Sequence, residues 1–197
     1  FCAMAYMVIS IGLDTLKYIV ILVVAMLVGF VLLFVMYIFL VKFYGRIKPL
    51  PLIKKLIEFL PVPFAIAGSS PCIPFTLKFC DELGIDEKLS SFTIPIGSNI
   101  NIHGACIIQM ICLVVFSKMA GMELNIFTIL TMIVVVLFLE VGQPGVSGAF
   151  IITVSISMST FGIPMGYWSL IIGAHQIFGR SITALNVAGD IAVTAAI

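Results

Sequence analysis

The feature that most constrains this chain is a run of 24 residues without a charged side chain, from Tyr18 to Val41. About 20 consecutive apolar residues are enough for a helix to span a bilayer. Across the whole chain 62% of residues are hydrophobic and 10% are charged, and a soluble domain of this size cannot bury that much apolar surface. The sequence therefore predicts an all-α, polytopic membrane protein. Its net charge of +1 gives no indication of nucleic-acid binding.

Basic residues indicate how this span is oriented. Five of the ten Lys and Arg residues fall within positions 42–55, directly after the span. Short loops rich in Lys and Arg remain on the cytoplasmic side of a membrane. We therefore expect this loop to be cytoplasmic.

Two apolar stretches are interrupted in the middle. In residues 48–84, the sequence Ala-Gly-Ser-Ser at positions 67–70 is surrounded by Pro61, Pro63, Pro71 and Pro74. In residues 124–160, the break lies at positions 140–148 and contains Gly-Gln-Pro-Gly. Each half is too short to span a bilayer, so the pattern predicts two re-entrant helical hairpins. The first would open to the cytoplasm and the second to the outside.

Two further segments are long enough to span, and each carries a polar interruption. Residues 88–118 contain GSNINIHG at positions 97–104, and residues 166–197 contain TALNVAGD at positions 183–190. The chain thus alternates hairpin, broken helix, hairpin and broken helix, with opposite topology in its two halves. Inverted repeats with interruptions at matching positions indicate the binding site of a secondary transporter. There, carbonyls released by unwinding bind cations, and helix N-termini bind anionic groups.

The order of these motifs resembles the family of dicarboxylate/amino acid:cation symporters over about residues 13–197. The motifs that carry the resemblance are AGSSPCIP at positions 67–74, Asn-x-x-Gly at 101–104, Gly-x-Pro-Gly at 142–145 and TALNVAGD at 183–190. The resemblance implies a homotrimeric transporter in a bacterial inner membrane, in which a mobile domain moves against a scaffold as an elevator. It implies no enzymatic activity.

By this resemblance, residues 1–12 are the end of a scaffold helix and residues 13–197 form the transport domain. The chain begins with Phe1 rather than Met, and the scaffold helices that form the trimer are expected to precede it. The expected parts of the transport domain are a transmembrane helix at 13–43, a re-entrant hairpin at 48–84, a broken transmembrane helix at 88–118, a second re-entrant hairpin at 124–160 and a last transmembrane helix at 166–197.

The resemblance also assigns residues to the site. Those expected to bind the solute are Ser69, Ser70, Gly145, Arg180, Thr183 and Asn186. Those expected to bind Na⁺ are Gly97, Asn101, Asn186 and Asp190. A carboxylate and backbone carbonyls supply hard oxygen ligands, which suit Na⁺. No cofactor is expected beyond the coupling ions, Na⁺, H⁺ or both, and none of the five cysteines has the spacing of a metal site.

The sequence departs from the family pattern within the site. The family's sodium-site aspartate is replaced by His103, and a substrate-contacting threonine is replaced by Ala105. The aspartate that binds the solute's amino group falls on Gly179, and the arginine that binds a second carboxylate falls on Ile182. An acidic solute is therefore less expected unless Arg180 reaches the site. A neutral amino acid, a monocarboxylate or another small anion remains open.

Ionisable residues inside membrane spans are costly and are therefore candidates for function. His103 is expected either to be a hydrogen-bonded core residue or to carry a coupling proton, because histidine titrates near neutral pH. Glu140 is expected to be an interfacial charge, to carry a coupling proton, or to pair with Arg180. Asp190 is the second candidate partner for Arg180.

The functional prediction is a secondary active symporter that moves a small carboxylate-bearing solute, an amino acid or a dicarboxylate, coupled to Na⁺, H⁺ or both. Its partners would be this solute, membrane lipid and further copies of the same chain. An ion or anion channel built on the same broken helices is the alternative. An intramembrane aspartyl protease would need a second aspartate inside a span besides Asp190, and the Gly-x-Ser-x-Gly turn of serine hydrolases is absent from the sequence.

Overall fold

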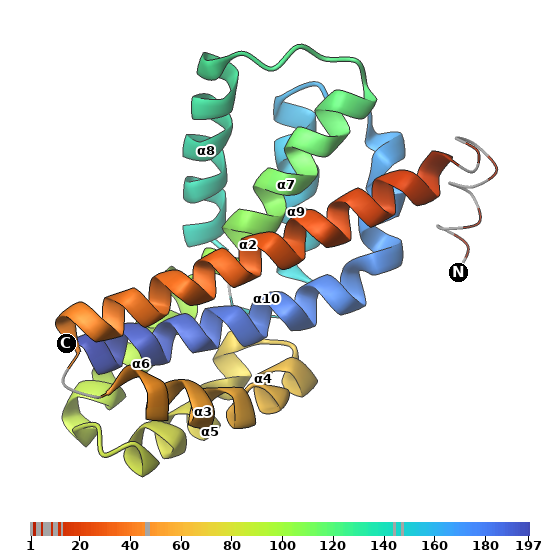
Figure 1. Ribbon diagram of the computed structural model, residues 1–197. Coiled ribbons are helices and arrows are strands. Elements are labelled where there is room, and N and C mark those ends of the chain that lie inside the picture. The colour runs from red at the N-terminus through yellow and green to blue at the C-terminus, as the bar shows by residue number, and fades with distance from the viewer. Residues whose placement is uncertain are drawn as a thin grey trace.

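The computed structural model describes residues 14–45, 48–143, 145–146 and 148–197, together with four single positions before residue 14. The segment 1–12, predicted to end a scaffold helix, lies outside the continuously described part, as do Pro144 and Ser147 of the second predicted hairpin. Regular structure in the described part is helical, and no strand occurs there (Figure 1). The predicted all-α class is therefore confirmed.

The helices follow one another through short connections. Their bounds are α2 (Asp14–Tyr44), α3 (Pro49–Phe59), α4 (Pro61–Ile66), α5 (Ser69–Glu82), α6 (Glu87–Ile100), α7 (His103–Met119), α8 (Ile126–Val141), α9 (Ala149–Thr160), a 3₁₀ turn η1 (Met165–Tyr167) and α10 (Trp168–Ala196). α2 and α10 lie side by side (Figure 1). In that view α7 and α8 lie on one side of this pair, α3, α4 and α5 lie on the other, and α6 passes behind the pair.

Two apolar clusters form the core, and they meet along α10. α10 contributes residues up to Ile182 to the cluster with α7, α8 and α9. From Leu185 onward it contributes to the cluster with α3, α5 and α6. The buried polar side chains of Thr183 and Asn186 lie on the same stretch of α10, at the junction of the two clusters. The junction therefore places polar groups deep in an otherwise apolar molecule.

Among the described residues, two segments are long and apolar enough to cross a membrane, Lys17–Tyr44 and Glu87–Met119. In the most apolar part of the first segment, 17% of the residues are buried within the molecule. Its exposed side chains include Val24, Leu27 and Val31. Extended apolar exposure of this kind is typical of a surface that faces lipid rather than water.

Helices are interrupted at two of the polar motifs. α4 ends at Ala67, whose φ of 60° and ψ of 34° place it in the left-handed region that side chains rarely adopt. α5 then begins at Ser69. α6 and α7 are separated by Asn101, with φ −86° and ψ 68°, and Ile102, with φ −104° and ψ 44°. Each interruption leaves helix-end N–H and C=O groups without a partner in their own helix.

The last spanning segment differs from its prediction. α10 is continuous from Trp168 to Ala196, so the interruption predicted in this segment is wrong. Asn186 and Asp190 lie four residues apart and therefore share one face of the helix. Both side chains find hydrogen-bond partners on other helices, so α10 presents its polar groups without unwinding.

Candidate functional site

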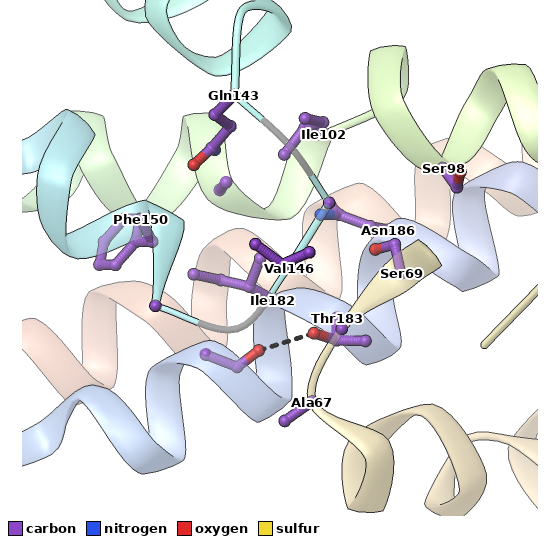
Figure 2. A pocket seen from close by; sticks show the side chains of 15 residues that line it. Ala67, Ser69, Ser98, Ile102, Gln143, Val146, Phe150, Ile182, Thr183 and Asn186 are labelled. Carbon is purple, nitrogen blue, oxygen red and sulfur yellow. Dashed lines mark hydrogen bonds between the residues drawn. The ribbon is translucent and has the colours of Figure 1, made fainter. Parts of the chain in front are cut away.

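A cavity of about 40 Å³ lies where the loop between α4 and α5 meets the loop between α8 and α9 (Figure 2). The residues that line it are Ala67, Gly68 and Ser69 from the first loop and α5; Ser98, Ile102 and Ala105 from α6 and α7; Gln143, Gly145, Val146, Gly148 and Phe150 from the second loop and α9; and Gly179, Ile182, Thr183 and Asn186 from α10. A single water needs about 10–15 Å³ by this measure, so the cavity exceeds the space of one water and suits only a small solute.

The two loops touch each other directly. The backbone N–H of Ser70 donates a hydrogen bond of 3.1 Å to the carbonyl of Gly145. A β-carbon at Gly145 would collide with the carbonyl of Ser98 and would lie 3.0 Å from Oγ of Ser70. Glycine is therefore required for this close approach. Ser69, Ser70 and Gly145, which the sequence assigned to solute binding, are thus brought together.

One face of α10 forms a wall of the cavity. Gly179, Ile182, Thr183 and Asn186 follow the spacing of one helical face. The Thr183 hydroxyl donates to the Gly179 carbonyl at 3.0 Å, the bond drawn in Figure 2. Oδ1 of Asn186 accepts a hydrogen bond of 2.8 Å from the N–H of Gly104, in the first turn of α7. Oδ1 of Asn186 therefore binds an N–H group that the start of α7 leaves free. The amide N–H₂ group of Asn186 can still donate hydrogen bonds.

The side chain of Arg180 contacts the end of α4 rather than the cavity. Its Nη1 donates to the carbonyls of Phe64, at 3.2 Å, and Ala65, at 3.0 Å, near the end of α4. It does not belong to the lining of the cavity. The ion pair predicted between Arg180 and Glu140 or Asp190 is therefore replaced by hydrogen bonds to carbonyls that a helix end leaves free.

A second polar cluster lies further along α10. Nδ2 of Asn101, at the break between α6 and α7, donates a hydrogen bond of 2.7 Å to Oδ1 of Asp190. A β-carbon at Gly97 would lie 2.5 Å from the same oxygen, so the carboxylate packs against the backbone of α6. Oδ1 of Asn101 is buried and has no hydrogen-bond partner among the described residues. The cluster joins Gly97, Asn101 and Asp190, three of the four residues predicted to bind Na⁺.

A buried carboxylate with a single neutral donor is electrostatically incomplete. Asp190 is 4% exposed, and removing such a charge from water is costly unless it is paired. A cation beside Asp190 and the free oxygen of Asn101 would compensate this charge. The hard oxygen groups of the cluster are those that Na⁺ prefers.

Tyr37 on α2 joins this cluster, and sequence reasoning missed it. Its hydroxyl lies 3.1 Å from Nδ1 of His103, and which of the two groups donates depends on the histidine tautomer. A β-carbon at Gly189 would lie 2.5 Å from the Tyr37 hydroxyl and 2.9 Å from Nδ2 of Asn101. Tyr37 therefore bridges His103 to the surroundings of Asp190. A tyrosine within an apolar run carries no signal that would have singled it out.

Glu140 lies at the end of α8, behind the second loop. It is completely buried and accepts hydrogen bonds from the hydroxyl of Thr153, at 2.9 Å, and from Nε2 of Gln143. Nε2 of Gln109 in turn donates to the carbonyl of Thr153 at 3.2 Å and to Oγ of Ser157 at 2.5 Å. This polar network connects α7, α8 and α9. Sequence reasoning singled out Glu140 but not its partners.

Comparison with known proteins places this geometry in context. The sequence model that describes the sodium:dicarboxylate symporter family matches residues 1–197 of this chain. The human neutral amino acid transporter A is 31% identical over 148 residues, which are 75% of this chain and 28% of the relative. The rat neutral amino acid transporter B(0) is 31% identical over 132 residues, 66% of this chain and 24% of the relative.

A third relative is named as an excitatory, rather than a neutral, amino acid transporter. The mouse excitatory amino acid transporter 4 is 27% identical over 144 residues, which are 73% of this chain and 26% of the relative. The chain therefore spans about a quarter of the length of the curated relatives that it matches.

Proposed function

Since the chain belongs to the sodium:dicarboxylate symporter family, we propose that it forms the solute-binding and cation-binding part of a cation-coupled amino acid symporter. Members of the family and the relatives above are transporters rather than enzymes. They are also multi-pass membrane proteins, which agrees with the apolar surface of α2. The proposed solute site is the cavity between the two loops.

The proposed solute is a small neutral amino acid. The observation that carries this proposal is the lining of the cavity, in which the described residues supply hydroxyl, amide and apolar groups but no charged side chain. A second carboxylate on the solute would need a cationic partner there. Arg180, the nearest candidate by sequence, is engaged with the carbonyls of Phe64 and Ala65 instead. Two of the relatives are named as neutral amino acid transporters, which supports the same class.

Neutral donors are available for the solute's carboxylate. Asn186, whose amide N–H₂ group can donate, lines the cavity together with Ser69. Ser69 is the first residue of α5, and the N–H groups of a helix N-terminus attract anions. The apolar side chains of Val146, Phe150 and Ile182 would contact a short aliphatic solute side chain.

The proposed cation is Na⁺, held by Asp190, Asn101 and backbone oxygen atoms near Gly97. The hydrogen bond from Gly104 to Asn186 connects this cluster to the solute cavity along α10. Through that connection, cation binding would stabilise the arrangement that binds the solute.

His103 and Glu140 are proposed as carriers of any coupled proton, because both are ionisable groups placed next to the two clusters.

The proposal also covers the movement of the protein and its assembly with further copies. We propose residues 13–197 as a transport domain with two re-entrant hairpins that moves as an elevator within a homotrimer. The relatives described above come from mammals, so the bacterial inner membrane expected from the sequence has no support from them and is not proposed.

Uptake into proteoliposomes by the full-length protein tests the proposal. The panel consists of L-alanine, L-serine, L-aspartate and propionate, each driven in turn by a Na⁺ gradient and by a H⁺ gradient. We expect Na⁺-driven uptake of alanine and serine, reduced at least about 10-fold in Asn186→Ala by loss of a hydrogen bond to a charged group. Gln176→Ala, on the exposed surface of α10, is the matched control. Ion current without any solute would favour a channel instead.

A further inference from the structure

The side chain of Gln143 presents an unused hydrogen-bond acceptor at the solute cavity. Gln143 lies in the loop after α8 and lines the cavity (Figure 2). Its Nε2 donates to Oε2 of Glu140. Its Oε1 is buried and has no hydrogen-bond partner among the described residues. An enclosed acceptor without a donor costs free energy, and a donor brought by a ligand would remove that cost.

The orientation of this amide is imposed by its neighbours. When Glu140 is ionised its carboxylate only accepts hydrogen bonds, so the N–H₂ end of Gln143 faces Glu140 and the oxygen end faces away. Glu140 is itself held by the hydroxyl of Thr153 at 2.9 Å. Nε2 of Gln109 donates a hydrogen bond of 3.2 Å to the backbone carbonyl of Thr153. Groups from three helices therefore fix the direction in which Oε1 points.

Two of the other side-chain oxygen atoms around the cavity already accept hydrogen bonds. Oδ1 of Asn186 accepts from the N–H of Gly104. Oγ of Ser98 accepts a hydrogen bond of 3.2 Å from Nδ2 of Asn99, and it donates to the carbonyl of Pro95 at 2.9 Å. The described lining contains no carboxylate. Oε1 of Gln143 is thus an enclosed side-chain oxygen that lacks a donor and can only accept, whereas the hydroxyl of Ser69, which also lines the cavity, can donate as well as accept.

We propose that Oε1 of Gln143 accepts a hydrogen bond from the amino group of the transported solute, and that Glu140 and Thr153 act as positioning residues for it. The proposal rests on the proposed function and identifies how the same site selects amino acids. A solute without an N–H donor leaves Oε1 unpaired and is rejected for that reason. Gln143 is therefore a specificity-determining residue that separates amino acids from monocarboxylates of the same size.

Competition between L-alanine and propionate tests this assignment, because the two compounds differ by the amino group. The measured quantity is the ratio of their inhibition constants against Na⁺-driven uptake of radiolabelled alanine by the full-length protein in proteoliposomes. Gln143→Met keeps the length of the side chain but removes the acceptor. We expect the preference for alanine over propionate to fall about 10-fold to 100-fold, the loss typical of a hydrogen bond to a charged group.

Thr153→Val provides a second variant that leaves Gln143 in place. Loss of the Thr153 hydroxyl frees Glu140 and, with it, the orientation of the Gln143 amide, so we expect a smaller fall in the same ratio. Thr153→Ser restores the hydroxyl and should restore the ratio. Gln176→Leu, on the exposed surface of α10, is the matched control and should leave the ratio unchanged.

The outcomes separate this inference from the proposed function. If Gln143→Met weakens alanine and propionate equally, or leaves both unchanged, the inference is overturned while Na⁺-driven alanine uptake by the unmodified protein still supports the symporter. If the unmodified protein takes up no compound of the panel, the proposed function is overturned and the inference with it.

Discussion

Nδ2 of Asn101 lies 2.7 Å from Oδ1 of Asp190, which joins the break between α6 and α7 to the far part of α10. The oxygen of the Asn101 side-chain amide, Oδ1, is buried without a partner among the described residues. The pair thus combines an uncompensated carboxylate with a free carbonyl oxygen. This relationship underlies the proposed cation site and the first prediction.

Asp190→Asn is expected to abolish the effect of Na⁺ on the protein. A cation that binds only the folded state stabilises it by about 2.7 kcal/mol at 100 times its Kd. For a protein of this size that corresponds to a rise of about 5–10 °C in Tm. We expect this Na⁺-dependent rise in the unmodified protein and none in the variant, measured by thermal unfolding in detergent with Na⁺ or choline.

Glu123→Gln is the matched control for this experiment, because Glu123 is exposed in the connection between α7 and α8. It should retain the full Na⁺ effect. A Na⁺-dependent rise that persists in Asp190→Asn would place the cation elsewhere.

Gly145→Ala is expected to separate the two loops. The added β-carbon would collide with the Ser98 carbonyl and crowd Oγ of Ser70, where the Ser70 N–H now donates to the Gly145 carbonyl. Overpacking of this kind costs about 1–3 kcal/mol. We expect alanine affinity to fall about 5-fold to 100-fold, measured by equilibrium binding of radiolabelled alanine. Gly166→Ala, whose β-carbon meets no atom within 4 Å, should bind normally.

Tyr37→Phe is expected to destabilise the protein by leaving Nδ1 of His103 without its partner at 3.1 Å. An unpaired buried polar group costs about 1–3 kcal/mol, and His103 is partly buried, so we expect the lower part of that range, a fall of roughly 2–6 °C in Tm. The measurement is thermal unfolding of the detergent-purified protein. Tyr44→Phe removes a hydroxyl from a residue that is 75% exposed, so its Tm should not change. Equal Tm values for the two variants would argue against a structural bond between Tyr37 and His103.

Arg180→Lys is expected to leave solute selectivity unchanged. Nη1 of the guanidinium donates to two carbonyls near the end of α4, and lysine keeps the charge but lacks the rigid planar group that places this nitrogen. We therefore expect a modest loss of stability, about 0.5–1.5 kcal/mol, as for a typical hydrogen bond. The ratio of alanine to aspartate uptake should match that of the unmodified protein. A changed ratio would show that Arg180 reaches the solute.

Several features could be read from the sequence because they depend on neighbours along the chain. The apolar run of α2 requires only composition, and the turn between α4 and α5 lies at the Ala-Gly-Ser-Ser motif that predicted it. The polar motif around Asn101 likewise marks the end of α6. The predicted break in the last segment failed, since the polar residues of α10 are satisfied by other helices rather than by unwinding.

The sequence by itself therefore determined the helical membrane class and the polar motifs of the site, because hydrophobicity and helix-breaking residues act locally. Only the tertiary structure decided which side chains meet. Arg180 bonds α4 rather than Glu140, Tyr37 reaches His103, and the buried network around Glu140 directs Gln143 toward the cavity. Most of these contacts join helices far apart in the chain, and the orientation of each helix face depends on how all the helices pack together.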